Sequence, residues 1–155
     1  MANTFKVKVE RTSAEIEASP ILIDQLETIE GQLCRQASAL VKKANDMIIA
    51  QDSPNDRFPP LLLQFRVGSR PFENRLVWAR YTPKKYNLRG TAKRFSKEVP
   101  GRRNGKYRSY IFNVFDEPLR SELIAIEKEA TVLRRRMSFW GSVRREAKGI
   151  LQGER

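Results

Sequence analysis

The stretch LRSELIAIEKEATVLRRRMSFW, residues 119–140, decides the fold. Its apolar residues recur at alternating steps of four and three, and they are Leu119, Leu123, Ile126, Ala130, Leu133, Met137 and Trp140. This spacing predicts an α-helix with three heptads of a and d positions on one side. Asp116 is a favourable N-cap, and Pro118 suits the first turn. Three heptads are short for a free coiled coil, so we expect the stripe to pack within the chain, on a helix or a sheet, with homodimerisation as the alternative.

A second long helix is predicted upstream, because apolar residues again recur at steps of three and four. They are Leu22, Leu26, Ile29, Leu33, Ala37, Leu40, Ala44 and Met47. Ser19 and Pro20 form a typical helix start, and the turn-favouring residues 51–56 end the helix after about 30 residues. Cys34, the single cysteine of a chain without histidine, lies within this pattern, and we expect it in the core.

The segment between the two helices is predicted to form an antiparallel β-meander of three to four strands. Residues 61–67 alternate between the two faces, and residues 75–81 are rich in aromatic and β-branched side chains. Residues 91–99 and 106–115 are the third and fourth expected strands, joined across Asn104-Gly105, because Asn-Gly is the strongest short hairpin signal. A small sheet needs one face covered. We therefore expect an α+β fold with a long N-terminal helix, this meander and a long C-terminal helix as the cover.

The length of 155 residues fits one domain. Residues 1–18 alternate weakly and then become polar, which indicates an N-terminal arm or an edge strand, so residues 19–155 are expected to form a single α+β domain. The N-terminus has no apolar signal core, and no apolar run is long enough for a membrane span. A single cysteine cannot form an intrachain disulfide. These features predict a cytoplasmic protein without a membrane partner.

Positive charge is concentrated in the middle of the chain. Residues 57–115 include fifteen Lys or Arg and two acids, whereas the first 56 residues have six bases and nine acids and the last 40 have nine and seven. A like-charged surface costs self-repulsion in a compact protein and is most simply explained by a polyanionic partner. Eleven of the fourteen aromatic residues lie in the same segment. We therefore predict a nucleic-acid-binding protein with double-stranded DNA as its partner.

The predicted DNA-binding residues are basic, aromatic or amide side chains of the expected strands and loops. They are Arg66, Arg75, Arg80, Lys84, Lys85, Tyr86, Arg89, Lys93, Arg94, Arg102, Arg103, Asn104, Lys106 and Arg108. Guanidinium and ammonium groups bind phosphate, and Tyr86 lies in a basic loop from which it can contact bases or sugars. Arg102, Arg103 and Asn104 on the turn are the candidates for base readout in a groove, with an ordinary solvated turn as the alternative.

A second basic cluster, Arg134-Arg135-Arg136, is expected on the polar face of the last helix. A rotation of about 100° per residue places it away from Leu133 and Met137. The cluster offers a second contact with phosphate. The alternative is that it forms salt bridges with Glu127 and Glu129 of the same helix.

Sequence signatures of enzymes are missing. The chain has no histidine, which removes the commonest general base, the serine–histidine and cysteine–histidine pairs, and the zinc motifs that contain histidine. It has no GxxxxGK[ST] phosphate loop, and the basic segment has only Glu73 and Glu98 for two-metal chemistry. We expect no enzymatic activity, no cofactor and no metal site.

The order of these features resembles a known family. The matching segments are LVKKAN (residues 40–45), FPPLLL (58–63), WAR (78–80), KYRSY (106–110) and a final helix with Glu127 and LRR (133–135). Over residues 20–145 the chain is similar to the MobI-type mobilisation proteins of conjugative plasmids and integrative conjugative elements. The resemblance implies an accessory protein of the relaxosome that recognises the origin of transfer and helps the relaxase to start DNA mobilisation. It supplies no catalytic motif.

Two other classes of protein remain open at this point. A structural or ribosome-associated RNA-binding protein shares the charge but tends to have basic tails, whereas both ends of this chain are near neutral or acidic. An anti-restriction factor or an inhibitor of a nucleic-acid enzyme is the other class. Mimicry of DNA is disfavoured there, because the charge has the wrong sign.

Overall fold

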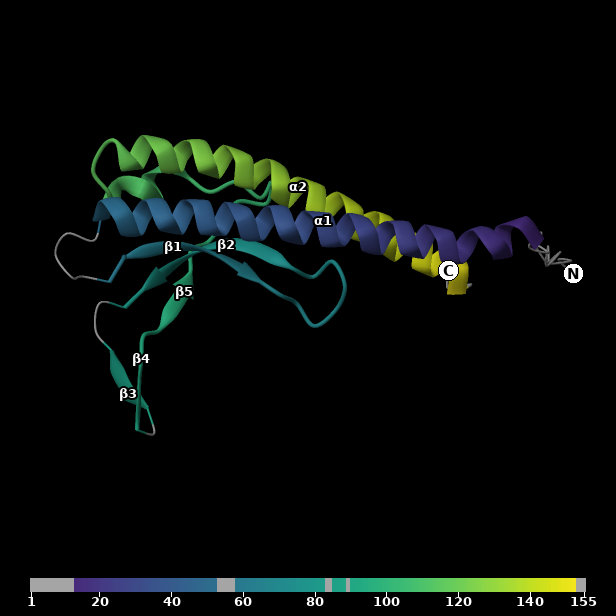
Figure 1. Cartoon of the computed structure of the whole chain (residues 1–155), viewed down its shortest axis with the longest axis horizontal. Helices are drawn as coiled ribbons and strands as arrows, with labels where there is room; N and C mark the ends of the chain where they lie inside the picture. Colours follow the sequence, from purple (N-terminus) through teal and green to yellow (C-terminus); the bar gives the residue numbers. More distant parts are fainter. Residues whose placement is uncertain (1–12, 53–57, 83–84, 89, 153–155) are drawn as a thin grey trace, which may run out of the picture.

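The computed structural model describes residues 13–52, 58–82, 85–88 and 90–152. Two long helices, α1 (Ser13–Asp52) and α2 (Leu119–Gln152), lie over an antiparallel sheet (Figure 1). The sheet consists of β1 (Leu61–Arg66), β2 (Arg75–Tyr81) and β5 (Ser96–Glu98) in the order β1-β2-β5. The fold is therefore α+β, with the predicted order of helix, meander and helix.

The two helices run antiparallel, as their contacts show. In the first half of α1, Glu30 lies 3.7 Å from Arg144, towards the end of α2. Near the end of α1, Gln51 Nε2 donates a hydrogen bond of 2.8 Å to Glu122, at the start of α2. The two helices therefore lie side by side over much of their length (Figure 1).

The apolar stripe of α2 is buried inside the molecule, as predicted. Its buried members are Leu119, Leu123, Ile126, Ala130, Leu133 and Met137, and Trp140 is half-buried. They form one core with the buried stripe of α1 and with the sheet and the segment after it, where Trp78 and Phe112 meet edge to face at 5.0 Å. A homodimer through this stripe is therefore not available, because the chain itself covers it.

Helix α1 is longer than predicted. It begins at Ser13, so the expected start at Ser19-Pro20 is wrong, and residues 13–18 are helical rather than part of an arm. A proline near a helix end removes one backbone hydrogen bond, and this proline does not stop the helix. The sequence Thr12-Ser-Ala-Glu15 matches a capping box and is the start signal that we missed. The rest of the expected arm, residues 1–12, lies outside the described residues.

The second half of the meander also differs from prediction. The expected strand 91–99 divides into β4 (Thr91–Lys93) and β5, which belong to different sheets. The expected strand 106–115 is wrong, because a 3₁₀ helix, η1 (Ser109–Val114), occupies it. Its buried residues Ile111 and Phe112, together with Phe115 directly after it, follow a helical spacing rather than the alternation of a strand, since all three must face the core beneath α2.

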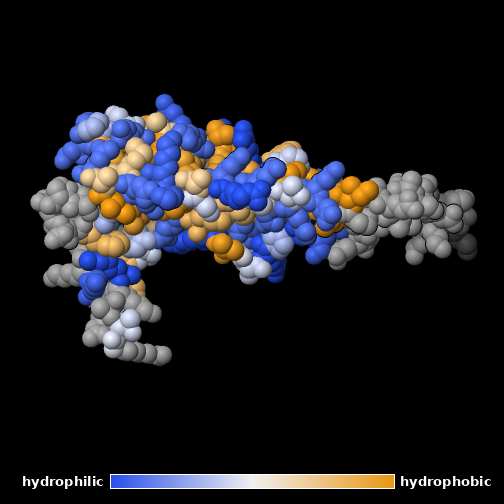
Figure 2. All heavy atoms as spheres, in the orientation of Figure 1, coloured by the Kyte–Doolittle hydropathy of each residue, from blue (hydrophilic) through white to orange (hydrophobic). Residues whose placement is uncertain are grey.

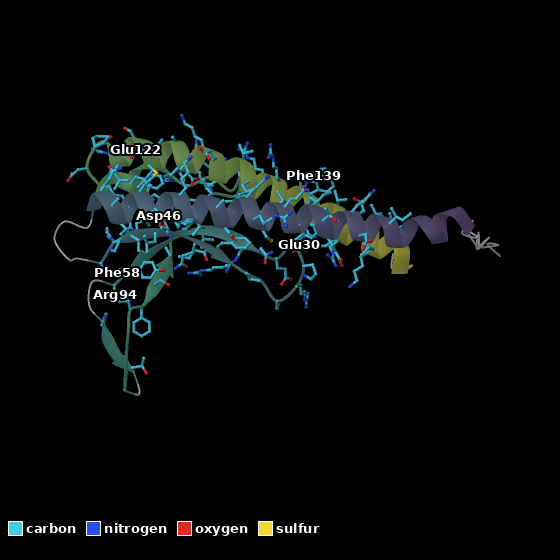
Figure 3. All side chains as sticks on the ribbon, viewed as in Figure 1. Glu30, Asp46, Phe58, Arg94, Glu122 and Phe139 are labelled. Carbon is cyan, nitrogen blue, oxygen red and sulfur yellow. The ribbon has the colours of Figure 1, made fainter. Side chains whose placement is uncertain are left out.

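A two-stranded hairpin, called the arm below and distinct from the expected N-terminal arm, projects away from the helices. It pairs β3 (Tyr86–Leu88), in a stretch predicted as a loop, with β4 (Figure 1). At its base, the Arg94 guanidinium lies 4.4 Å from the centroid of the Phe58 ring, which contacts Tyr81 at the end of β2 (Figure 3). A cation–π contact of this kind helps to fix the base of the arm against the sheet.

The loop between β1 and β2 is attached to α1. Glu30 accepts a hydrogen bond of 2.6 Å from the backbone N–H of Phe72 and a longer one from the Asn74 amide. The same amide lies 3.2 Å from Cys34 Sγ, and burial raises the pKa of the Cys34 thiol. Cys34 is half-buried, so it lies at the edge of the core rather than inside it as predicted.

Strand β1 is an edge strand whose free side is partly closed by a side chain. Asn45 of α1 accepts a 3.0 Å hydrogen bond from the Leu63 N–H and donates one of 2.9 Å to the Leu63 carbonyl. One amide therefore satisfies both backbone groups that a neighbouring strand would otherwise engage.

The surface is mostly polar. Figure 2 shows hydrophilic residues over both helices, with hydrophobic atoms in small separate patches. In the described part of the chain, no helix is long and apolar enough to cross a membrane. Along α1, residues 13–34 include five acidic residues and no basic one, so this stretch of α1 differs in charge from the basic middle segment.

Candidate nucleic-acid interface

A buried carboxylate organises the region where the basic turn meets α2. Glu127 is 5% exposed, and its Oε1 accepts hydrogen bonds from the backbone N–H of Tyr107 and from Thr131 Oγ1, both at 2.9 Å. Its Oε2 accepts from Trp78 Nε1 at 2.8 Å. Arg134 completes the set with two parallel bonds of 2.8 and 3.0 Å. Glu127 therefore joins the sheet, the basic turn and α2 at one point.

Arg134 is a structural residue rather than a member of an exposed cluster. Only 11% of its side chain is exposed, which contradicts its predicted place on the polar face of α2. Its guanidinium also donates to the carbonyls of Leu76 and Gly105 at 2.7 and 2.8 Å. It lies 4.6 Å from the centroid of the Tyr107 ring, whose phenol has a pKa raised by burial. The salt bridge that we considered between this cluster and Glu127 is thus present.

Residues 102–108, called the tip segment below, form a tight turn fixed on this base. Gly105 N–H donates to the Arg102 carbonyl at 2.9 Å, and Gly105 has a positive φ of 74°, which favours glycine. Asn104 Oδ1 accepts from the Lys106 N–H at 3.1 Å. The turn expected at Asn104-Gly105 is therefore confirmed, although it does not join two strands.

The tip segment presents cations without acidic partners. Arg102, Arg103, Lys106 and Arg108 are exposed, and none of them forms a salt bridge with another described residue. Because Glu127 and Arg134 anchor the backbone below them, these charges extend from a fixed support. The arrangement suits phosphate binding, since the cations need not be released from internal pairs first.

A groove separates the tip segment from α2. Its volume is about 610 Å³, and we call it the tip–helix groove. Its basic lining residues are Arg102, Lys106 and Arg108 on one wall and Lys128 and Arg135 on the other. Its one acid is Glu127, which Arg134 already neutralises. The groove is therefore strongly cationic.

A second hollow of about 420 Å³ lies at the outer end of the tip segment. It includes Arg103, Asn104, Arg135 and Phe139, and the Phe139 side chain is 60% exposed (Figure 3). Arg135 lines both hollows, and its Nε approaches the Asn104 carbonyl at 3.4 Å. The turn thus stands between two depressions of the same surface.

Two of the predicted arginines are partly neutralised on the sheet. Arg66 and Arg75 are directly opposite each other in the register of β1 and β2. Glu98 lies 3.2 Å from Arg66 and 3.4 Å from Arg75, which offsets the repulsion between them. Their charge is therefore less available to a partner than that of the tip segment.

Arg80 retains its charge and has a basic neighbour. It lies opposite Lys97 in the register of β2 and β5, and both are exposed. Among the residues that the structure describes, neither forms a salt bridge. Like charges directly opposite in a sheet destabilise it, and a bound phosphate would relieve this repulsion.

The remaining predicted residues belong to the arm and its base. Lys85 is exposed, and Arg94 donates to the Thr82 carbonyl at 3.3 Å besides its contact with Phe58. Tyr86 and Lys93 contribute backbone to β3 and β4. Lys84 and Arg89 lie outside the described residues, so their role stays a prediction.

Lys128 and Lys97 are the cations that sequence reasoning missed. Lys128 precedes Arg135 by two helical turns, so both fall on one face of α2. The same spacing joins Glu127 to Arg134. A search for charged residues seven apart on the last helix would have found the wall of the groove.

Fold and charge together define a small basic α+β protein in which several unpaired cations gather around one turn. The chain belongs to the MobI protein family, a family of mobilisation proteins, whose model matches residues 31–148. The match begins within α1 and ends within α2, so it includes the sheet, the arm, the tip segment and the groove. It confirms the resemblance noted from the sequence. No curated protein and no solved structure matches the chain.

Proposed function

We propose that this protein binds double-stranded DNA at an origin of transfer and assists the relaxase in initiating mobilisation, in the cytoplasm. The unpaired cations on both walls of the tip–helix groove are the observation that carries the proposal. Contacts with phosphate position a protein on DNA, whereas contacts with base edges specify the sequence. Membership of the MobI family supports a role in mobilisation.

The geometry favours a division of roles within the interface. Lys128 and Arg135 lie on a rigid helix and suit backbone contacts, because a helix fixes their spacing. Arg102 and Arg103 stand on the turn between the two hollows, where they can enter a groove of the duplex. A hydrogen-bonded contact between arginine and guanine is the commonest specific base contact.

The proposal gives the protein no catalytic step. The chain has no histidine, and the acid nearest the tip segment, Glu127, has both oxygens engaged. DNA cleavage is therefore assigned to the relaxase, and this protein acts by binding. Purified protein alone should leave supercoiled plasmid intact, and a nicked product that depends on this protein alone would contradict the assignment.

A salt series with a matched pair of variants tests the interface. One variant changes Arg102, Arg103, Lys106 and Arg108 to Gln. Fluorescence anisotropy on labelled duplex should show binding weakened about tenfold or more near 100 mM salt, with the slope of log K against log salt reduced by about 3 to 4. The cause is the loss of counterion release at those phosphates.

The matched control removes the same charge elsewhere. Lys42, Lys43, Arg70 and Arg120 are surface cations, each within 4 Å of an acid. Changing them to Gln should leave the salt slope close to that of the native protein. Equal losses in the two variants would mean that net charge alone drives binding, and the assignment of the interface would be wrong.

A further inference from the structure

The tip–helix groove contains an aromatic and apolar section that phosphate binding does not use. Tyr110 of η1 and Val132 of α2 both line it, and they are 55% and 48% exposed. Tyr107 and Phe112 contribute to its lining from the core side. An exposed aromatic ring between two cationic walls is not needed to hold the sugar–phosphate backbone.

The dimensions of the groove suit a nucleotide. Its volume of about 610 Å³ lies within the range of small-molecule sites, and its two walls come from different elements joined through Glu127. A duplex keeps its bases stacked inside, so its backbone alone would face Tyr110. An unpaired base can leave the stack and lie on the ring.

Cations lie on both sides of this aromatic section. Arg108 is near it in the chain, and Lys128 and Arg135 line the opposite wall. Sites for single-stranded nucleic acid combine a positive groove for the backbone with aromatic rings for the bases, and the tip–helix groove has both parts.

We propose that the tip–helix groove takes one unpaired nucleotide of single-stranded DNA, with its base stacked on Tyr110 and its neighbouring phosphates held by Arg108, Lys128 and Arg135. The inference rests on the proposed function and deepens it. The duplex contacts place the protein at the origin, and the groove holds a strand that has locally opened. Binding of the open strand would favour the melted state by mass action.

The test compares three DNA probes of equal length: a duplex, one single strand, and a duplex with a central unpaired bubble. Tyr110→Ala should weaken binding to the strand and the bubble about tenfold and leave duplex binding within about twofold. Tyr110→Phe should restore the native values, because the ring suffices for stacking. In the native complex, 2-aminopurine in the bubble should lose fluorescence on binding, and in Tyr110→Ala it should not.

Phe139→Ala is the matched control. Phe139 is a similarly exposed aromatic residue of α2 that lines the other hollow, and its loss should not change the preference for unpaired DNA. Equal losses for duplex and bubble with Tyr110→Ala, or no loss with either, would overturn the inference while duplex binding and the proposed function remained. Tighter binding to an RNA strand would overturn the choice of DNA. Native protein that bound none of the probes would contradict the proposed function as well.

Discussion

At the residue scale, Asn45 satisfies the N–H and the carbonyl of Leu63 on the free side of β1. An exposed sheet edge is a template for pairing with another chain, and natural proteins close or disrupt such edges. Here the closing group belongs to the helix that covers the sheet. The same two hydrogen bonds therefore fix α1 on β1 and block the edge at Leu63.

Replacing Asn45 should reveal both effects. Asn45→Ala leaves the two Leu63 groups without their partner, so the free energy of unfolding should fall by about 1–3 kcal/mol. Urea denaturation followed by circular dichroism measures the loss. Asn45→Asp keeps an acceptor for the Leu63 N–H but removes the donor. Its free energy of unfolding should lie between those of the native protein and Asn45→Ala. A stability unchanged by Asn45→Ala would mean that the bonds contribute nothing net.

Glu127 is the second residue with a decisive role. Glu127→Gln removes the counter-charge of the nearly buried Arg134, and breaking a buried pair on one side costs about 3–5 kcal/mol. Glu129→Gln makes the same chemical change two residues away, where the partner is the exposed Lys43, and surface pairs contribute at most about 1 kcal/mol. Thermal and urea unfolding of both variants measures the difference. Similar small losses would show that Glu127 does not organise the turn.

Arg134, Arg135 and Arg136 show what a sequence cannot tell at this scale. The three look alike in the chain, yet Arg134 is nearly buried and its two neighbours are exposed. The helical period predicts which residues of α2 face the core. Whether the residues beside that stripe are buried or exposed depends on the loop that packs on them. No periodicity describes the path of residues 99–108, so the burial of Arg134 was not predictable.

At the element scale, patterns with many repeats were predicted well and short ones poorly. The stripe of α2 and the strands β1 and β2 appear where the sequence placed them. Residues 106–115 alternate well enough to suggest a strand. However, their buried apolar side chains must all point into the space beneath α2, and a 3₁₀ helix places them on that one side. Tertiary packing thus overrode local preference.

The helix packing can be tested by truncating one core residue. Ile126 is buried in the stripe between α2 and the rest of the core, so Ile126→Ala should cost about 2–4 kcal/mol through lost contacts and a residual cavity. Val132→Ala is the control on the same helix, since Val132 is half exposed. Its loss should stay near the range of surface changes, about 0.5 kcal/mol. Denaturation curves of the two variants decide whether the stripe carries the fold.

At the scale of the whole molecule, the sequence indicated the candidate interface as a segment of the chain but not as a surface. The charge count located residues 57–115, yet the structure divides their cations among the tip segment, the sheet and the arm. Glu98 compensates Arg66 and Arg75, and α2 contributes Lys128 and Arg135. Pairing with acids depends on which strands meet, and the composition of a segment does not contain that information.

The proposed recognition of an origin of transfer makes a prediction at this scale. Arg102→Ala should erode the preference for origin DNA while non-specific binding stays nearly intact, because a base contact contributes about 1–3 kcal/mol of discrimination. Asn104→Ala should act in the same direction, but Asn104 Oδ1 also holds the Lys106 N–H. Asn104→Asp retains that acceptor and separates the two roles.

Footprinting on plasmids with and without the origin, in the presence and absence of relaxase, is the corresponding measurement. Protection confined to the origin, with faster nicking by the relaxase, is the expected result. Even coverage of both plasmids with no effect on nicking would leave a protein that coats DNA without selecting a site.

The acidic first half of α1 gives the molecule an electric polarity. The contacts of Glu30 with Arg144 and of Gln51 with Glu122 place Lys128 and Arg135 beside the later half of α1. The cations of the tip–helix groove and the acidic stretch of α1 therefore occupy different lengths of the helix pair, although Arg144 offsets part of the negative charge. In the field of a phosphate backbone such a dipole experiences a torque before any contact forms. Under the proposed function, molecules would therefore approach DNA already oriented, with the tip segment inward and the acidic stretch of α1 outward.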